Sequence, residues 1–82
     1  MRTLTEQEKI KINEIIADMC LVPIEWVKDE SAFYFDLGGD SLDEAEVYVL
    51  IEKEFGIKLP KDIEKQSPLV SDFYELLSNE LN

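Results

Sequence analysis

The side chain best placed for chemistry is Ser41, which follows two glycines and lies among carboxylates in the stretch GGDSLD at residues 38–43. A serine at a glycine-rich turn before a helix has the outline of a hydrolase nucleophile, but in hydrolases a second glycine stands two residues after the serine. Here that position is aspartate, and the chain contains no histidine, the commonest base for activating a serine hydroxyl. Lysine is a rarer base, and Lys28, Lys53 and Lys58 fall at no recognisable motif spacing. We therefore expect no catalytic residue and no enzyme activity.

The residue types and their spacing also argue against a phosphate-binding loop and against a metal site. Neither of the glycine-rich patterns that cradle nucleotide phosphates is present. A calcium loop of the EF-hand type beginning at Asp36 would need glycine in place of Ser41 and glutamate in place of Val47. Cys20 is the only cysteine, so it can form no internal disulfide, and without histidine it has no Cys/His pair for zinc. We expect no metal ion and expect Cys20 to be a small core residue.

The remaining interpretation is that another protein acts on Ser41. Asp40 is predicted as the N-cap of a helix that begins at Ser41, with Asp43 and Glu44 in its first turn. Unpaired backbone N–H groups at a helix start favour an anion, so a covalently carried phosphodiester suits this position. The neighbouring acids oppose that charge in part, but they would attract a basic modifying enzyme.

Two of the expected helices have clear ends in the sequence. Thr5 and Glu8 fit a capping box, and apolar residues follow at helical spacing, which predicts a first helix over residues 5–20. The helix that begins at Ser41 is predicted over 41–55, because Gly56 is suited to the left-handed conformation that ends a helix.

The rest of the chain predicts two further helical segments and a long connection. Residues 21–40 have neither helical nor strand periodicity, but their apolar residues indicate a packed connection with one short turn. Residues 61–66 are predicted as a brief helix, and a last helix should run from Ser67 and Pro68, as N-cap and first helical residue, to about Glu80. No segment alternates as a strand would. The expected fold is all-α, a small four-helix bundle of three main helices and one short one, with a long loop between the first two.

Length and charge limit the partners. The 82 residues fit a single domain over 1–82 with a small core, and 45% apolar residues argue for a folded chain. Eight basic residues against nineteen acidic ones give a net charge of −11, which disfavours nucleic acid and favours basic protein surfaces. No apolar run approaches the ~20 residues that span a bilayer, and residues 1–11 contain no secretory apolar segment. We expect a cytoplasmic protein that is not inserted in a membrane.

The motifs around Ser41 resemble those of the acyl carrier proteins, in which Asp-Ser-Leu opens the second helix of a four-helix bundle. Asp40, Ser41 and Leu42 match this motif, with DLG at 36–38 before it and EFGIKLP at 54–60 after it. The resemblance covers nearly the whole chain, and its combined spacing is far more specific than the three-letter motif.

The resemblance implies a cofactor and a role for Ser41. In that family the serine hydroxyl attacks the β-phosphate of coenzyme A in a magnesium-dependent reaction. A separate phosphopantetheinyl transferase, the holo-acyl-carrier-protein synthase, runs this reaction and leaves a 4′-phosphopantetheine arm. Asp40 and Leu42 would flank the attachment point. The arm's thiol then carries acyl groups as thioesters, while other enzymes perform the catalysis.

The helix after Ser41 is also predicted to be a recognition surface. One broad face should pack in the core, while a narrower apolar stripe bordered by acids faces outward. The residues expected to contact partners are Leu42, Glu44, Ala45, Glu46, Val49 and Glu52. By the resemblance, the partners are acyl-chain synthesis and transfer enzymes with basic docking surfaces, visited by a monomeric carrier through weak, salt-sensitive contacts. The alternative is that a loop or the last helix covers the stripe.

The cargo is open at this point. Ser41-Leu42-Asp43 followed by an acidic helix in a short chain resembles a fatty-acid carrier, and fatty acid biosynthesis is the leading interpretation. The aromatic residues and Leu-Gly-Gly at 33–39 instead resemble peptidyl carriers, in which a second glycine is common. A specialised type II polyketide or lipid carrier is a third alternative. An interaction module of a different class, in which Ser41 is unmodified and merely starts a helix, is the fourth.

Overall fold

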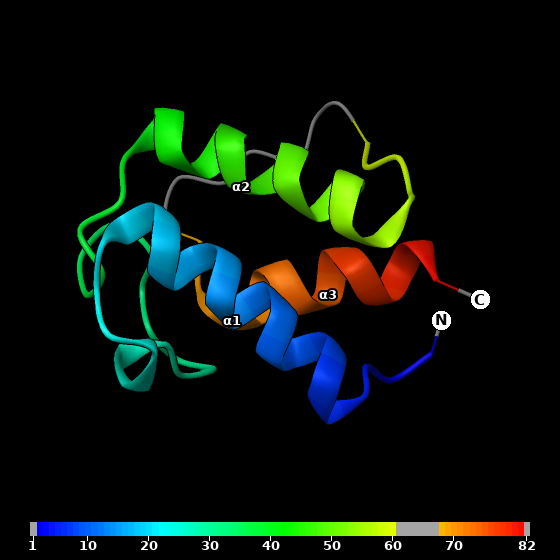
Figure 1. Cartoon of the computed structure of the whole chain (residues 1–82), viewed down its shortest axis with the longest axis horizontal. Coiled ribbons are helices and arrows are strands. Elements are labelled where there is room, and N and C mark those ends of the chain that lie inside the picture. The colour runs from blue at the N-terminus through cyan, green and yellow to red at the C-terminus, as the bar shows by residue number, and fades with distance from the viewer. Residues whose placement is uncertain (1, 61–67, 82) are drawn as a thin grey trace.

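The computed structural model describes residues 2–60 and 68–81, which fold as three α-helices and a short 3-10 turn (Figure 1). The elements in chain order are α1 (Glu6–Cys20), η1 (Ile24–Trp26), α2 (Ser41–Phe55) and α3 (Val70–Glu80). Within the described ranges there is no β-strand, and no helix is long and apolar enough to cross a membrane. The predicted all-α bundle is confirmed for these ranges, while the short helix expected at 61–66 lies outside them.

The core lies where the three helices meet. α1 packs against both α2 and α3, with its length crossing the bundle as Figure 1 shows. Each helix contributes a pair of side chains with no exposed surface, spaced four residues apart: Ile12 and Ile16, Val47 and Ile51, Phe73 and Leu77. α3 adds Val70, which is fully buried as well. A spacing of four residues places side chains on one face of a helix, so the periodicity in the sequence correctly indicated the buried faces.

The ends of the first two helices follow their local sequence. The backbone N–H of Glu8 donates to Thr5 Oγ1 at 3.1 Å, and the N–H of Thr5 donates to Glu8 Oε1 at 2.8 Å, so the predicted capping box is present. The side chain of Arg2 also donates to Glu8. The hydrogen bond from Arg2 has the largest effect on the pKa of Glu8 and the one from the backbone of Thr5 the next largest, and together they lower this pKa to about 2. α2 ends as predicted at Phe55, and its C-cap Gly56 is left-handed with a φ of 65°.

The start of α3 differs from the prediction. α3 begins at Val70 rather than Pro68, and its N-cap is Leu69 rather than Ser67. The reason is a pairing that is distant in sequence: an isolated antiparallel bridge joins Leu69 to Ala32. Its hydrogen bonds run from the N–H of Phe33 to the carbonyl of Pro68 and from the N–H of Val70 to the carbonyl of Ser31, both at 2.9 Å. Residues 68 and 69 are therefore held extended, and the helix begins after them.

The connection between α1 and α2 contains the 3-10 turn η1, and only part of its apolar residues pack as expected, since Leu21, Ile24, Trp26 and Phe35 are exposed. Val27, Phe33 and Leu37 are buried in the core. Ser31 is also buried, and its hydroxyl donates to the carbonyl of Trp26 at 2.8 Å while accepting from the N–H of Lys28 at 3.0 Å. The connection is thus fixed both by apolar anchors and by its own hydrogen bonds.

Candidate functional site

Ser41 is the first residue of α2, and its side chain is exposed. A reciprocal pair of side chains caps the helix: the N–H of Asp43 donates to Asp40 Oδ1 at 2.8 Å, and the N–H of Asp40 donates to Asp43 Oδ2 at 3.2 Å. The predicted N-cap and first-turn acid are therefore both confirmed, and together they form a capping box. This arrangement fixes the backbone on both sides of Ser41 while leaving its hydroxyl at the surface.

The two glycines before Ser41 are there for different reasons. Gly38 has a φ of 76°, a backbone conformation that side chains rarely adopt. Gly39 has an ordinary φ, but a Cβ at this position would lie 2.3 Å from Cε2 of Phe33, whose ring has no exposed surface. The N–H of Gly39 also donates to the carbonyl of Phe33 at 2.9 Å. Gly39 is therefore needed to let the chain lie directly against a core ring.

Glu44 does not lie where the sequence placed it. We expected its carboxylate on the partner-facing surface, but the residue is only 1% exposed. The hydroxyls of Tyr34 and Tyr48 both donate to it, one to each carboxylate oxygen. Glu44 is thus buried with both of its carboxyl oxygens hydrogen-bonded, which is the usual condition for burying a polar side chain. Tyr48 is buried as well.

The two tyrosines connect Glu44 to the aromatic core. The ring of Phe33 lies 6.0 Å from that of Tyr34 and 5.4 Å from that of Phe73, and the ring of Phe73 lies 5.4 Å from that of Tyr48. These are distances at which aromatic pairs attract one another. The four rings and Glu44 form a closed circuit, which we call the aromatic ring cluster. It joins the connection, α2 and α3 directly behind the start of α2.

Replacing Glu44 with glutamine is expected to destabilise the fold. An amide keeps the shape but has one acceptor oxygen and an NH₂ donor, so one tyrosine hydroxyl would face a donor. We expect Glu44→Gln to lower the free energy of unfolding by about 1–2 kcal/mol. Urea unfolding followed by circular dichroism would measure this. Adding Tyr48→Phe, which removes one hydroxyl, should cost less in the Glu44→Gln variant than in the native chain, and an equal cost in both would contradict the pairing.

The remaining stripe residues of α2 are placed largely as predicted. Leu42, Glu46 and Val49 are exposed, and Ala45 is half-buried. Glu52 is half-buried too, and its Oε2 accepts a hydrogen bond from the backbone N–H of Leu59 at 2.8 Å. The structure therefore leaves a narrower outward stripe than expected, without Glu44 and with Glu52 engaged in holding the chain after α2.

Cys20 lies at the end of α1, close to the start of α2. The thiol is half-buried rather than fully in the core. Burial, then the negative charges of Asp43 and Asp40, raise its pKa to about 11. A thiol with this pKa is protonated and a poor nucleophile at neutral pH, so Cys20 adds no reactive group to the site. Among the described residues, no group of three or more aspartate, glutamate or cysteine side chains is placed to hold a metal ion.

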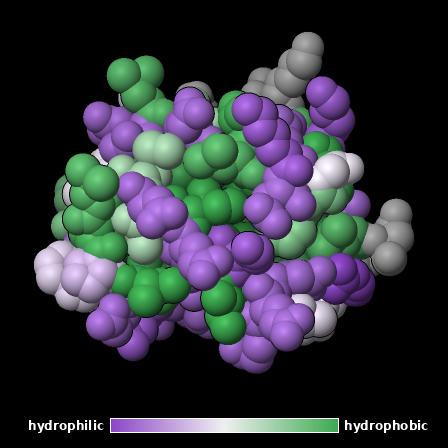
Figure 2. All heavy atoms as spheres, viewed as in Figure 1, coloured by the Kyte–Doolittle hydropathy of each residue, from purple (hydrophilic) through white to green (hydrophobic). Residues whose placement is uncertain are grey.

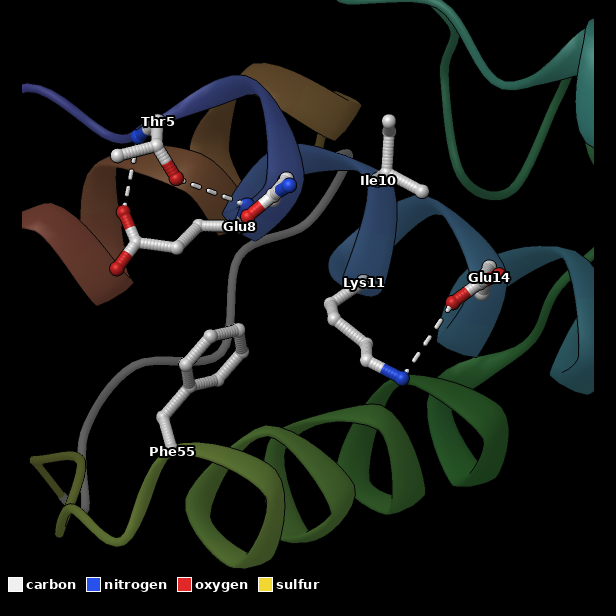
Figure 3. A pocket seen from close by; sticks show the side chains of 7 residues that line it. Thr5, Glu8, Ile10, Lys11, Glu14 and Phe55 are labelled. Atoms are coloured by element: carbon white, nitrogen blue, oxygen red, sulfur yellow. Dashed lines mark hydrogen bonds and ion pairs between the residues drawn. The ribbon is translucent and has the colours of Figure 1, made fainter.

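A groove of about 570 Å³ lies between the first half of α1 and the end of α2 (Figure 3). Ile10 and Phe55 supply apolar parts of its lining, and the ammonium of Lys11 lies 3.8 Å from the carboxylate of Glu14 at its edge. Phe55 is the last residue of α2 and Ser41 is the first, so the groove lies about 20 Å from Ser41 along the helix. It is separate from the candidate site.

Comparison with known proteins gives a consistent family. A family model described as a phosphopantetheine attachment site matches residues 11–77. An acyl carrier protein of Nitratidesulfovibrio vulgaris (strain DP4) is 38% identical over 76 residues, which are 93% of this chain and 97% of that protein. One from strain Miyazaki F is 41% identical over 69 residues, 84% and 91% of the two chains. One from Thermosynechococcus vestitus is 34% identical over 71 residues, 87% and 88%. The chain therefore belongs to the acyl carrier protein family, whose members are non-catalytic carriers of a covalent phosphopantetheine group.

Proposed function

We propose that Ser41 is the residue to which a phosphopantetheinyl transferase attaches the 4′-phosphopantetheine arm of coenzyme A. In this step a bond forms between Ser41 Oγ and the β-phosphorus of coenzyme A, the phosphoanhydride bond breaks, adenosine 3′,5′-bisphosphate leaves, and the hydroxyl proton is released. The observation that carries this proposal is the exposed hydroxyl of Ser41 at the first position of a fifteen-residue helix. The residues there fit the group. The backbone N–H groups of the first helical turn and the positive end of the helix dipole favour the phosphodiester, and the exposed position leaves room for the arm.

The neighbours of Ser41 would hold it for the transferase. The side chain of Asp40 is committed to the cap, where it accepts from the N–H of Asp43, so it fixes the helix start. Leu42 is 79% exposed and offers apolar contact beside the arm. Once attached, the arm supplies a terminal thiol that carries acyl groups as thioesters, and the protein contributes position and recognition.

We further propose fatty acid biosynthesis as the pathway, with a monomeric carrier in the cytoplasm. The supporting observations are that the relatives named above are acyl carrier proteins of about the same length, and that Gly39 has a packing role. Because the ring of Phe33 requires a glycine there, Gly39 is no longer an argument for an aminoacyl cargo. The interpretation as a specialised type II polyketide or lipid carrier does not depend on Gly39. It therefore remains the alternative to fatty acid biosynthesis that has to be tested.

The test is the intact mass of the folded chain after incubation with coenzyme A, magnesium and a broad-specificity phosphopantetheinyl transferase. A gain of one phosphopantetheine group is expected. No gain would overturn the proposal in favour of an unmodified interaction module. Loading of the modified chain by an acyl-carrier synthetase, in comparison with amino-acid adenylating enzymes and polyketide acyltransferases, would then rank the pathways.

We also propose that the outward stripe of α2 docks on basic surfaces of partner enzymes. Because Glu44 is buried, it is not part of this stripe. The stripe consists of Leu42, Ala45, Glu46 and Val49, with Glu52 at its border. The support is that exposed apolar side chains there lie beside an exposed acid, Glu46, in a chain of net charge −11. Such surfaces give fast encounter and weak, reversible binding.

Glu46→Lys is expected to slow partner turnover more at low salt than at high salt. The change replaces an attractive charge with a repulsive one, and mobile ions screen exposed charges over about 10 Å at 0.1 M salt. We expect a loss of about five- to tenfold in kcat/KM at 0.05 M salt that shrinks to about twofold at 0.5 M. The measurement is a salt series with a transferase or an acyl-carrier synthetase.

Glu54→Lys is the matched control for this experiment. Glu54 is also exposed on α2 and the change in net charge is the same, but it lies well around the helix from the stripe. Equal losses for the two variants at every salt concentration would point to overall charge rather than to the stripe.

A further inference from the structure

Three apolar side chains at the Ser41 end of the molecule are almost fully exposed. Leu21, Phe35 and Leu42 are 90%, 80% and 79% exposed, more than the other large apolar side chains of the described ranges. Leu21 follows the last residue of α1, Phe35 lies in the connection, and Leu42 follows Ser41. Figure 1 shows the end of α1, the connection and the start of α2 at one end of the bundle, and Figure 2 shows apolar side chains protruding there among hydrophilic ones.

Leu21 is an unfavourable residue for the fold at its position. It is the C-cap of α1 with φ 58° and ψ 45°, and within the described ranges it is the only residue other than glycine with a positive φ. Glycine or asparagine is the usual choice for a helix end of this kind. Packing of the Leu21 side chain does not offset the cost of this backbone conformation, because the side chain is almost fully exposed. A residue that strains the backbone and also exposes apolar surface is a reason to look for a function.

Phe35 is likewise not explained by packing. Its neighbours Tyr34 and Leu37 are respectively half-buried and buried, and Asp36 accepts a hydrogen bond from the N–H of Ala32 at 2.7 Å, so the turn is well fixed. The ring of Phe35 nevertheless projects from this fixed turn into solvent. The connection therefore presents the ring in a defined place at no gain in core packing.

The charges near these side chains indicate the chemistry of what covers them. Acidic residues lie on each of the three segments: Asp18 in the last turn of α1, Asp36 beside Phe35, and Asp40 and Asp43 around Ser41. Of the described lysines and arginines, the one in the connection is Lys28, and the others lie before residue 12 or after residue 52. An apolar surface with an acidic border fits a protein partner whose own apolar patch is bordered by lysine and arginine.

We infer that Leu21 and Phe35, together with Leu42, form a docking surface for the phosphopantetheinyl transferase that acts on Ser41, whose contact patch is apolar and bordered by basic side chains. We call these three residues the end surface. It rests on the proposed function and extends it, since it adds the end of α1 and the connection to the stripe on α2. The continuity of the two surfaces is provided by Leu42, which belongs to both.

The experiment measures the rate of arm transfer by intact mass for Leu21→Asn and Phe35→Ser. Asparagine tolerates the left-handed conformation, so Leu21→Asn should keep or raise the melting temperature, by up to about 5 °C. Both variants should nevertheless lower kcat/KM for transfer by about three- to tenfold, the range expected for an interface contact of moderate importance. Gain of stability with loss of rate is a result that a merely structural role for Leu21 would not give.

Two further variants complete the test. Ile10→Asn removes an exposed apolar side chain from α1 at the far end, and its transfer rate should stay within about twofold of wild type. Asp18→Asn should slow transfer at 0.05 M salt and not at 0.5 M, if the partner's border is basic. Wild-type rates for Leu21→Asn and Phe35→Ser, or an equal loss for Ile10→Asn, would overturn the end surface alone. A wild-type chain that gains no arm would overturn the proposed function along with it.

Discussion

Ser41→Ala is expected to abolish attachment of the arm completely. The hydroxyl oxygen of Ser41 is the atom that would form the bond to phosphorus, and alanine offers no replacement nucleophile. Because Ser41 is exposed and the cap is made by Asp40 and Asp43, the fold should be retained, with a melting temperature within a few degrees of wild type. Intact mass after incubation with coenzyme A, magnesium and the transferase is the measurement.

Ser71→Ala is the matched control for this loss. Ser71 lies in the first turn of α3, and its backbone N–H, which the substitution keeps, donates to the carbonyl of Asp29. The same substitution there should leave the gain in mass unchanged. A gain that persists in Ser41→Ala would move the attachment site to another residue, and a loss in both variants would indicate an effect on folding or on docking.

Gly39→Ala is expected to give the largest loss of stability of the substitutions considered. The added methyl group would lie 2.3 Å from Cε2 and 2.7 Å from Cδ2 and Cζ of Phe33. The ring cannot simply turn away, because it has no exposed surface and packs on Tyr34 and Phe73. Overpacking of this kind costs about 2–3 kcal/mol. Thermal unfolding should therefore show a melting temperature lower by about 10–20 °C.

Two comparisons separate overpacking from backbone strain. Gly38→Ala meets no atom within 4 Å but strains a backbone with φ 76°, so it should cost only about 1 kcal/mol. Phe33→Leu, which shortens the side chain, should reduce the further cost of Gly39→Ala in the double variant. If Gly39→Ala costs no more than Gly38→Ala, the ring is not the obstacle and Gly39 again becomes an argument about cargo.

The sequence predicted those features of the fold that are decided within a few residues. The capping box of Thr5 and Glu8, the N-cap Asp40, the last residue of α2 and the left-handed Gly56 depend on neighbours at most four positions away. The start of α3 was wrong because it depends on Leu69 pairing with Ala32, which is 37 positions away and has no local signal. A contact between distant segments overrode a favourable Ser-Pro helix start.

The positions of the site residues were likewise predicted where they depend on local sequence, and the prediction for Glu44 was wrong because its position depends on a distant contact. Ser41 and Asp40 were placed correctly, since helix caps are local. The sequence predicts Glu44 as a surface acid, because carboxylates are rarely buried unless hydrogen-bonded. Glu44 and Tyr48 are four positions apart on one helix, and this spacing is a usable sequence signal for the hydrogen bond between them. The hydrogen bond from Tyr34 comes from the connection, and no local sequence pattern indicates it. The exposure of Leu21 and Phe35 likewise cannot be derived from their apolar character.

The aromatic ring cluster has a consequence for the reach of the arm. Through the hydrogen bond from Tyr34 to Glu44 it joins the segment before Ser41 to the helix after it, so the backbone is held on both sides of Ser41. With the arm attached at Ser41, as proposed, the cargo would be tethered to a fixed root, and its local concentration at a partner's active site would depend on the length of the arm and on the docked orientation. Under the proposed attachment at Ser41, loosening this root would spread the same cargo over a larger volume and would lower its concentration at the partner's active site.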